Sequence, residues 1–186
     1  MKKLSLFLTC LTLIFSFMNS AQAQKSDLEN TLYIDTKYGR VIIEMLPKVA
    51  PKHVERIKTL VRQKFYDGIV FHRVIDGFMA QTGDPTGTGM GGSKLPDLKA
   101  EFSDEPHIRG AVSMARASDP NSGNSQFFIV TQDSRFLDKQ YTAWGRVTKG
   151  MEFVDKLKKG GGRDGKVIDP DSMIKVSIAA DASKAK

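Results

Sequence analysis

A fixed positive charge lies inside an apolar stretch of the chain, FHRVIDGFMAQTGD at residues 71–84. Arg73 stands there among Phe71, Val74 and Ile75. Because an arginine side chain stays protonated in proteins, it either turns to solvent or lies at a site that needs a cation. The chemistry open to such a site is hydrogen bonding to a group that changes its charge distribution in a transition state.

Other motifs that could carry chemistry have weak support. Residues 87–92, GTGMGG, match the pattern G-x-G-x-x-G, but an Asp-Pro pair precedes them and no helix pattern follows. We interpret them as a flexible loop rather than a dinucleotide site. The histidines, His53, His72 and His107, lack metal-ligand spacing, and no G-x-S-x-G elbow is present. We expect neither a metal nor a cofactor.

Short strands separated by glycine and proline are predicted to position these residues. The segments with strand patterns are 32–46, with a turn at 37–39, and 70–75, 79–82, 111–115, 126–131, 143–147 and 174–178. Helical spacing predicts helices at 51–63 and 151–158, the second ended by glycines 160–162. Many short strands with two isolated helices favour one mostly antiparallel β-barrel domain over βαβ units.

The first residues have the layout of a secretory signal peptide. Lys2 and Lys3 precede an apolar run, residues 4–18, and residues 21–23 form an A-x-A cleavage site. The run is shorter than the roughly 20 residues that span a bilayer, which favours cleavage after Ala23 over a membrane anchor. We expect a periplasmic protein with a signal peptide at 1–23, a polar leader at 24–30, one domain at 31–180 and a disordered tail at 181–186.

Composition narrows the function classes further. The only cysteine, Cys10, lies in the apolar run, so the mature chain would have no disulfide or thiol chemistry. The net charge is +7, and removing Lys2 and Lys3 leaves +5. No nucleic-acid motif accompanies this charge, so we interpret it as a solubility feature. We expect no nucleic-acid partner, no membrane contact after cleavage, and a monomer.

Two segments, residues 71–84 and SMARASDPNSGNSQFFIVTQDSRFLDKQYTAWGRV at 113–147, resemble the signature segments of the cyclophilin family of peptidyl-prolyl cis/trans isomerases. The resemblance extends from about Leu32 to Ile178 and includes the segment VAPKHVERIKTLV. It implies a closed eight-stranded antiparallel β-barrel capped by two α-helices. Its groove would lie on the outer surface, because side chains fill such a barrel's interior. The implied partners are proline-containing unfolded or partly folded polypeptides.

The resemblance also implies a role for each matching position. Arg73 would be the catalytic cation, and Gln81 would hydrogen-bond the substrate backbone. The other substrate-binding positions are Phe78, Met79, Phe128 and Leu137 around the proline ring, Ala115 and Arg116 along the peptide, Gln126 supporting Arg73 or the groove, and Phe136 and Tyr141 at the rim. His72 and Gly87 are possible secondary positions. Taken singly, the four pocket residues would be interpreted as core, and only their joint spacing argues otherwise.

Three positions differ from the family's most familiar form. Phe136 stands where many members have tryptophan, Tyr141 where many have histidine, and Arg116 where many have asparagine. These changes resemble the bacterial exported branch. The missing indole N–H at Phe136 predicts weak cyclosporin binding at most.

Two other functions remain open at this point. A proline-peptide binding module or holding chaperone would use the same groove, with turnover incidental. Adhesion to anionic surfaces through the basic tail, residues 180–186, is a third hypothesis.

Overall fold

The structure is a computed structural model of the chain, and it describes residues 27–182. The predicted signal peptide and cleavage site, residues 1–23, lie outside that range, as do residues 183–186 of the predicted tail. Within residues 27–182, no helix is both long and apolar enough to cross a membrane.

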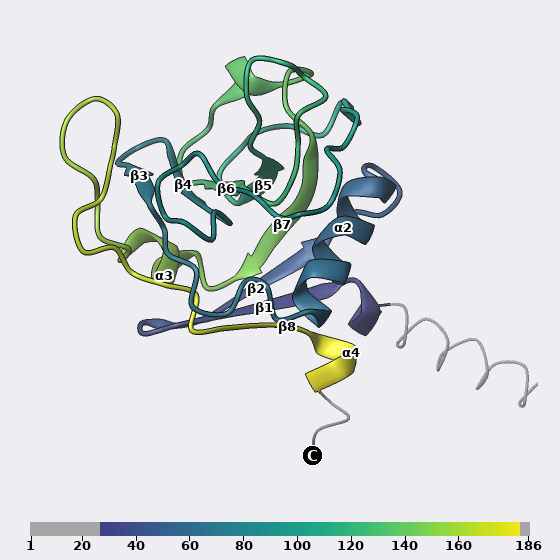
Figure 1. Cartoon of the computed structure of the whole chain (residues 1–186), viewed down its shortest axis with the longest axis horizontal. Coiled ribbons are helices and arrows are strands. Elements are labelled where there is room, and N and C mark those ends of the chain that lie inside the picture. The colour runs from purple at the N-terminus through teal and green to yellow at the C-terminus, as the bar shows by residue number, and fades with distance from the viewer. Residues whose placement is uncertain (1–26, 183–186) are drawn as a thin grey trace, which may run out of the picture.

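Eight strands form one sheet in the order β3-β4-β6-β5-β7-β2-β1-β8 (Figure 1). They are β1 (Thr31–Thr36), β2 (Gly39–Met45), β3 (Arg73–Ile75), β4 (Met79–Thr82), β5 (Ala111–Met114), β6 (Phe127–Val130), β7 (Ala143–Lys149) and β8 (Lys175–Ile178). Every neighbouring pair is antiparallel. The prediction of a mostly-β fold with eight antiparallel strands is confirmed.

The sheet is open, so the prediction of a closed barrel is wrong. β3 and β8 are the two ends of the strand order, and no ladder joins them. The long loop between α3 and β8 lies beside β3 instead (Figure 1). It makes an isolated bridge there, between Arg73 and Lys166. Glycines and a proline interrupt this segment, KGGGRDGKVIDP at 159–170, and such residues do not sustain a regular ladder.

The first predicted helix is α2 (Pro51–Arg62). Pro51 occupies its first turn, where a missing N–H leaves no hydrogen bond unmade. Val54, Ile57 and Leu60 lie on its buried face, at the spacing that places side chains on one side of a helix. This face packs the helix against the sheet.

The other helices are shorter than the sequence suggests or were not predicted. α3 (Met151–Asp155) ends before the predicted residue 158, and the Lys158 N–H donates to the Asp171 carboxylate (2.9 Å) rather than along the helix. α4 (Ala179–Ala182) contains the first two residues of the predicted disordered tail. Asp181 in α4 accepts from Arg62 Nε (2.9 Å), so the structure places residues 181 and 182 in a helix that contacts α2.

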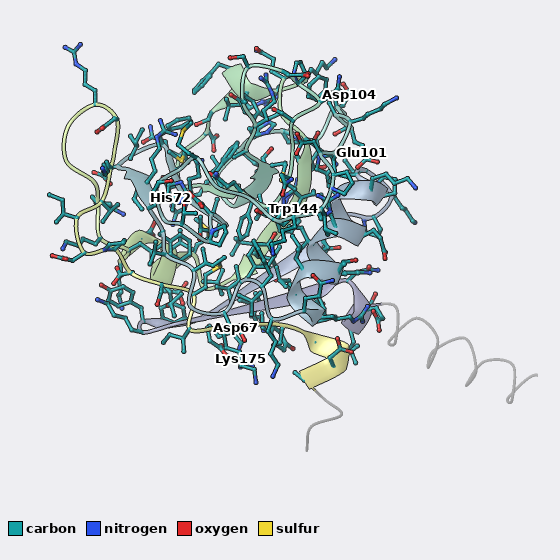
Figure 2. The ribbon with its side chains drawn as sticks, viewed as in Figure 1. Asp67, His72, Glu101, Asp104, Trp144 and Lys175 are labelled. Atoms are coloured by element: carbon teal, nitrogen blue, oxygen red, sulfur yellow. The ribbon has the colours of Figure 1, made fainter. Side chains whose placement is uncertain are left out.

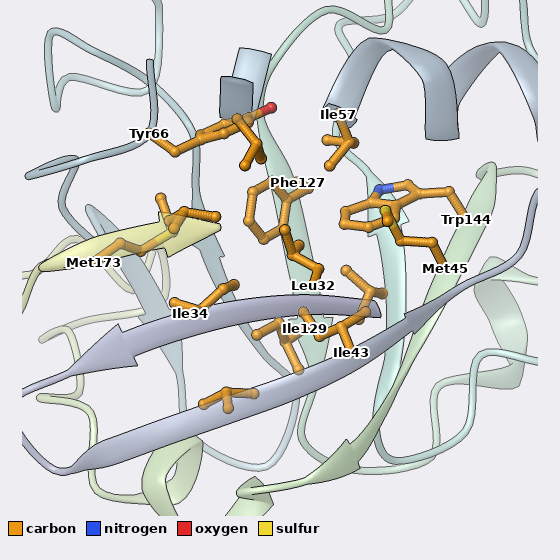
Figure 3. Close-up of a cluster of buried hydrophobic side chains, with 14 of the residues drawn as sticks. Leu32, Ile34, Ile43, Met45, Ile57, Tyr66, Phe127, Ile129, Trp144 and Met173 are labelled. Atoms are coloured by element: carbon orange, nitrogen blue, oxygen red, sulfur yellow. The ribbon is translucent and has the colours of Figure 1, made fainter. Parts of the chain in front are cut away.

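The main core lies between the sheet and α2 (Figure 3). Phe127 packs edge-on against Trp144 at 5.4 Å and against Tyr66 at 5.6 Å between ring centroids. Tyr66 is fully buried, and its hydroxyl donates to the Ser125 carbonyl (2.9 Å). That bond satisfies the polar end of a buried aromatic side chain, which holds the chain just before β6 in place.

Alternation along the strands separates this core from a second apolar cluster. Val74, Ala80 and Ile129 belong to the main core, whereas Met79 and Phe128, which neighbour two of them in sequence, belong to the second cluster. Successive side chains of a strand point to opposite faces. The sheet therefore carries the main core on one face and the second cluster on the other.

Candidate active site

Cross-strand pairing places three of the predicted site residues in one line. Arg73 on β3 pairs with Gln81 on β4, and Gln81 pairs with Phe128 on β6. Directly paired residues share a face of the sheet. Arg73 Nη1 donates to Gln81 Oε1 (3.2 Å), and Gln81 Nε2 donates to Gln126 Oε1 (2.9 Å). The structure thus joins Arg73, Gln81 and Gln126 by hydrogen bonds.

A second contact fixes Arg73 from the side of the long loop. Arg73 Nε donates to the Asp164 carbonyl (2.8 Å). The loop is itself tied to β3, because the Val74 N–H donates to the Gly165 carbonyl (2.8 Å). Gly165 has φ +69°, and an added Cβ would overlap Ile75, so only glycine fits. Sequence reasoning missed this contact, because the acceptor is a main-chain carbonyl group.

The predicted proline-binding residues gather in the second apolar cluster. Met79, Phe128 and Leu137 are almost fully buried, with 1%, 5% and 7% of their surface exposed. Phe78 and Tyr141 pack against them and are half-buried. The Tyr141 ring meets Phe128 edge-on at 5.7 Å. Together these side chains form an apolar cluster next to Arg73, whose Nη1 lies 4.0 Å from Met79 Sδ.

Phe136 forms the outer edge of this cluster. It belongs to the 3-10 turn η1 (Arg135–Leu137), and its ring lies 5.5 Å from that of Phe78. With 66% of its surface exposed, Phe136 is one of the few exposed large apolar side chains among residues 27–182. Phe136 therefore lies at the exposed edge of the second apolar cluster.

His107 packs against Phe128 of the second apolar cluster, a contact that the sequence did not indicate. Its ring stacks on Phe128 with 6.4 Å between centroids, Nε2 meets Ser113 Oγ (2.9 Å), and Nδ1 meets Asp138 Oδ1 (3.1 Å). Burial lowers the pKa of His107, although Asp138 opposes the shift. Ser113 is fully buried, so this Ser-His-Asp group braces the site and does not supply a nucleophile.

The Asp138 carboxylate ties η1 to His107. Burial would raise the pKa of Asp138, but hydrogen bonds from His107 and Arg135 outweigh it and lower the pKa to about 2. The carboxylate is therefore ionised near neutral pH, where it can accept from both residues.

A cleft of about 460 Å³ adjoins the hydrogen-bonded line. Four predicted residues line it, namely Gln81, Ala115, Arg116 and Gln126. Its other lining residues were missed from the sequence and are Gly89, Met90, Gly91, Gly92, Ser93, Asp97, Ala117, Ser122 and Asn124. Their signal was the glycine loop and the polar run DPNSGN before Ser125.

Arg116 forms one wall of this cleft and is held firmly. Its guanidinium lies 4.5 Å from the centre of the Tyr141 ring, a cation–π contact. Nη2 donates to the Gln140 carbonyl (3.1 Å), and Nη1 donates to the Ala117 carbonyl (2.9 Å). Arg116 therefore connects the cleft to the apolar cluster.

Two predicted secondary residues lie outside the cleft. His72 is buried beside β3 (Figure 2), and neither ring nitrogen has a hydrogen-bond partner among residues 27–182. Burial lowers the pKa of His72, so the ring is neutral near pH 7. Gly87 has φ +67° and faces Val70. Within the described residues, no three histidine, cysteine, aspartate or glutamate side chains are grouped to hold a metal ion.

Relatives identify the family to which this arrangement belongs. Residues 31–178 match the family described as cyclophilin type peptidyl-prolyl cis-trans isomerase/CLD. A probable peptidyl-prolyl cis-trans isomerase of Brucella suis biovar 1 (strain 1330) is 52% identical over 171 residues, covering 86% of this chain and 87% of the relative. The peptidyl-prolyl cis-trans isomerase-like 3 of Rattus norvegicus is 43% identical over 130 residues, covering 68% of this chain and 80% of the relative.

Two solved structures have the same fold. A cyclophilin from Hirschia baltica superposes with a TM-score of 0.74 at 32% identity, covering 82% of this chain and 74% of that one. A cyclophilin type isomerase from Cryptosporidium parvum, crystallised in the presence of the dipeptide Ala-Pro, gives 0.73 at 31% identity, covering 80% and 98%. The chain therefore belongs to the cyclophilin-type peptidyl-prolyl cis-trans isomerases and is an enzyme of that class.

Proposed function

We propose that the chain is an exported, periplasmic isomerase that accelerates rotation about X-Pro bonds while other exported proteins fold. The signal-peptide layout of residues 1–23 supports export. The observation that carries the chemistry is the hydrogen-bonded line of Arg73, Gln81 and Gln126 beside the second apolar cluster.

The X-Pro bond resists rotation because the nitrogen lone pair is delocalised into the carbonyl group, which gives a barrier of about 18–20 kcal/mol. At the top of the barrier the lone pair is localised on nitrogen and accepts a hydrogen bond. A donor aimed at that nitrogen stabilises the transition state more than either isomer, which is the condition for catalysis.

Arg73 has a donor left for this role. Asp164 accepts from Nε, and Gln81 accepts from Nη1. Nη2 makes no hydrogen bond to the rest of residues 27–182. We assign the N–H groups of Nη2 to the prolyl nitrogen, because the two hydrogen bonds of the guanidinium to oxygen atoms use Nε and Nη1 and leave those of Nη2 available.

Arg73 supplies only part of the acceleration. A hydrogen bond to a charged group contributes about 1.5–3 kcal/mol, which is about one or two decades of rate. An acceleration of about five decades requires about 7 kcal/mol. The remainder has to come from holding the substrate in a reactive geometry and from excluding water.

The surrounding residues are suited to that holding. We assign Phe78, Met79, Phe128 and Leu137 to the proline ring, and the cleft beside Ala115 to the rest of the peptide. The second N–H of Gln81 Nε2 remains for a substrate carbonyl, since the first donates to Gln126. The Cryptosporidium relative, crystallised in the presence of Ala-Pro, supports proline-containing peptides as the ligand class.

Export is tested by expressing the complete chain in a bacterium beside a matched variant that lacks residues 2–23. We expect isomerase activity of the complete chain in the osmotic-shock fluid, with the mass of a chain that begins at Gln24. The shortened variant should stay in the cytoplasm because it has no signal peptide. An unprocessed complete chain confined to the cytoplasm would refute export.

A further inference from the structure

The glycine loop after β4, residues 85–92, is built around one buried carboxylate. Asp84 has 1% of its surface exposed. Its Oδ1 accepts from the Thr86 N–H (2.7 Å) and from Thr86 Oγ1 (2.8 Å). Its Oδ2 accepts from the N–H groups of Gly89 (2.6 Å) and Gly91 (3.1 Å). One side chain thus fixes both ends of a short, glycine-rich stretch.

The same two glycines contact the candidate active site through their carbonyl groups. Gln126 Nε2 donates to the Gly89 carbonyl (3.0 Å) and to the Gly91 carbonyl (2.7 Å). Asp84 and Gln126 therefore hold opposite sides of the same backbone. Removing the Asp84 contacts releases the two carbonyls that orient Gln126.

The orientation of the Gln126 amide determines the direction of the two hydrogen bonds that connect it, through Gln81, to Arg73. A carbonyl can only accept, so the amide nitrogen of Gln126 faces the loop and its oxygen faces Gln81. Gln81 then turns its own nitrogen to Gln126 and its oxygen to Arg73. If either amide were reversed, an N–H group would face the guanidinium, and Arg73 would lose its acceptor.

The loop sequence is suited to this task. Gly89 has φ +86°, which favours glycine. An added Cβ at Gly91 would overlap Asp84 Oδ1. The segment at 87–92, whose sequence matches a dinucleotide motif, therefore wraps around a buried carboxylate.

We propose that Asp84 is a positioning residue for the isomerase reaction: by holding Gly89 and Gly91, it sets the hydrogen-bond direction that orients Arg73. This inference rests on the catalytic role proposed above for Arg73. Asp84 itself does not line the cleft and acts only through the loop.

A double-mutant cycle separates positioning from mere support of the fold. Asp84→Asn replaces one of the two acceptor oxygens by an amide donor, so that in either orientation of the amide at least one backbone N–H of the loop loses its acceptor. We expect kcat/KM on a proline-containing peptide to fall about tenfold with Arg73 present, and less than about twofold in the Arg73→Ala background. The loss should fall on kcat rather than KM, because an interaction made only in the transition state is removed.

Asp67→Asn is a control for the same chemical change at a remote carboxylate. Asp67 is exposed and accepts a single backbone N–H, that of Val176 (2.8 Å), and it lies near Lys175, away from His72, which Gly89 faces (Figure 2). This variant should keep wild-type kinetics. The side-chain amide signals of Gln81 and Gln126 in a ¹H–¹⁵N spectrum should shift in Asp84→Asn and stay unchanged in Asp67→Asn.

The outcomes separate a failure of the positioning role of Asp84 from a failure of the catalytic role of Arg73. An equal fold-loss from Asp84→Asn with and without Arg73, or no loss at all, overturns the positioning role alone. Wild-type activity in Arg73→Ala overturns the proposed mechanism and this inference with it.

If Asp84→Asn does not fold, Thr86→Val takes its place. This substitution removes only the hydroxyl that donates to Asp84 Oδ1, and the fold should tolerate it because Thr86 is exposed. It should lower kcat about twofold only where Arg73 is present, and an equal loss in both backgrounds overturns the inference.

Discussion

Some contacts of Arg73 could be predicted from the sequence and others could not. Its place in a signature segment and its pairing opposite Gln81 follow from short-range sequence patterns. Its contact with the Asp164 carbonyl does not, because 91 residues separate the two and the bond involves a main-chain atom. A backbone acceptor has no residue-type signature, so only the folded chain reveals it.

His107 illustrates the same limit. Its neighbours in sequence suggest an ordinary loop histidine, whereas the folded chain places it between Ser113 and Asp138 under Phe128. The residue type was visible in the sequence, and the packing partner was not.

Phe136 stands where many family members have tryptophan, and this difference predicts weak inhibition by cyclosporin. Phe136→Trp should lower the inhibition constant of cyclosporin about tenfold, because an indole N–H adds a hydrogen bond that contributes about 1–1.5 kcal/mol. The side chain is exposed, so the fold should tolerate the change. Phe136→Leu, which adds no donor, is the control, and equal inhibition of both variants would contradict the prediction.

At the scale of elements, the strands were predictable and the long loop was not. β3, β4 and β6 come from short segments separated by glycine- and proline-containing stretches, and their pairing alone brings Arg73, Gln81 and Phe128 to one face. The closed barrel was wrong because the glycine-rich segment at 159–170 lies between β3 and β8 as irregular chain. Periodicity marks where strands are, but it does not show whether the outermost two meet.

The buried carboxylate of the glycine loop, Asp84, should make the stability of the fold depend on pH. Burial would raise the pKa of Asp84, but hydrogen bonds from Thr86, Gly91 and Gly89 lower it to about 2, from 3.8. A lowered pKa stabilises the fold above pH 3.8, and the contribution, about 2 kcal/mol, is lost as the pH falls through about 2. In urea unfolding, wild type should exceed Asp84→Asn in stability at about pH 5, and the gap should narrow toward pH 2. A gap that stays constant would refute this account of Asp84.

At the scale of the whole molecule, one open sheet serves two purposes. Its inner face supports the main core around Phe127 and Trp144, and its outer face supports the second apolar cluster. The core was predictable from alternation. The role of the outer cluster was not, because Met79, Phe128 and Leu137 are nearly as buried as core residues. The family's signature spacing alone pointed to a site there.

The most direct measurement is isomerisation of a proline-containing peptide by wild type, Arg73→Ala and the control Arg40→Ala. Arg40 pairs with Asp35 in the first hairpin, away from the site. Arg73→Ala should stay folded and lose about 10- to 100-fold in kcat/KM, while Arg40→Ala keeps the wild-type value. An unchanged rate in Arg73→Ala would contradict the mechanism, and suppression of client aggregation that survives the same substitution would favour a holding chaperone instead.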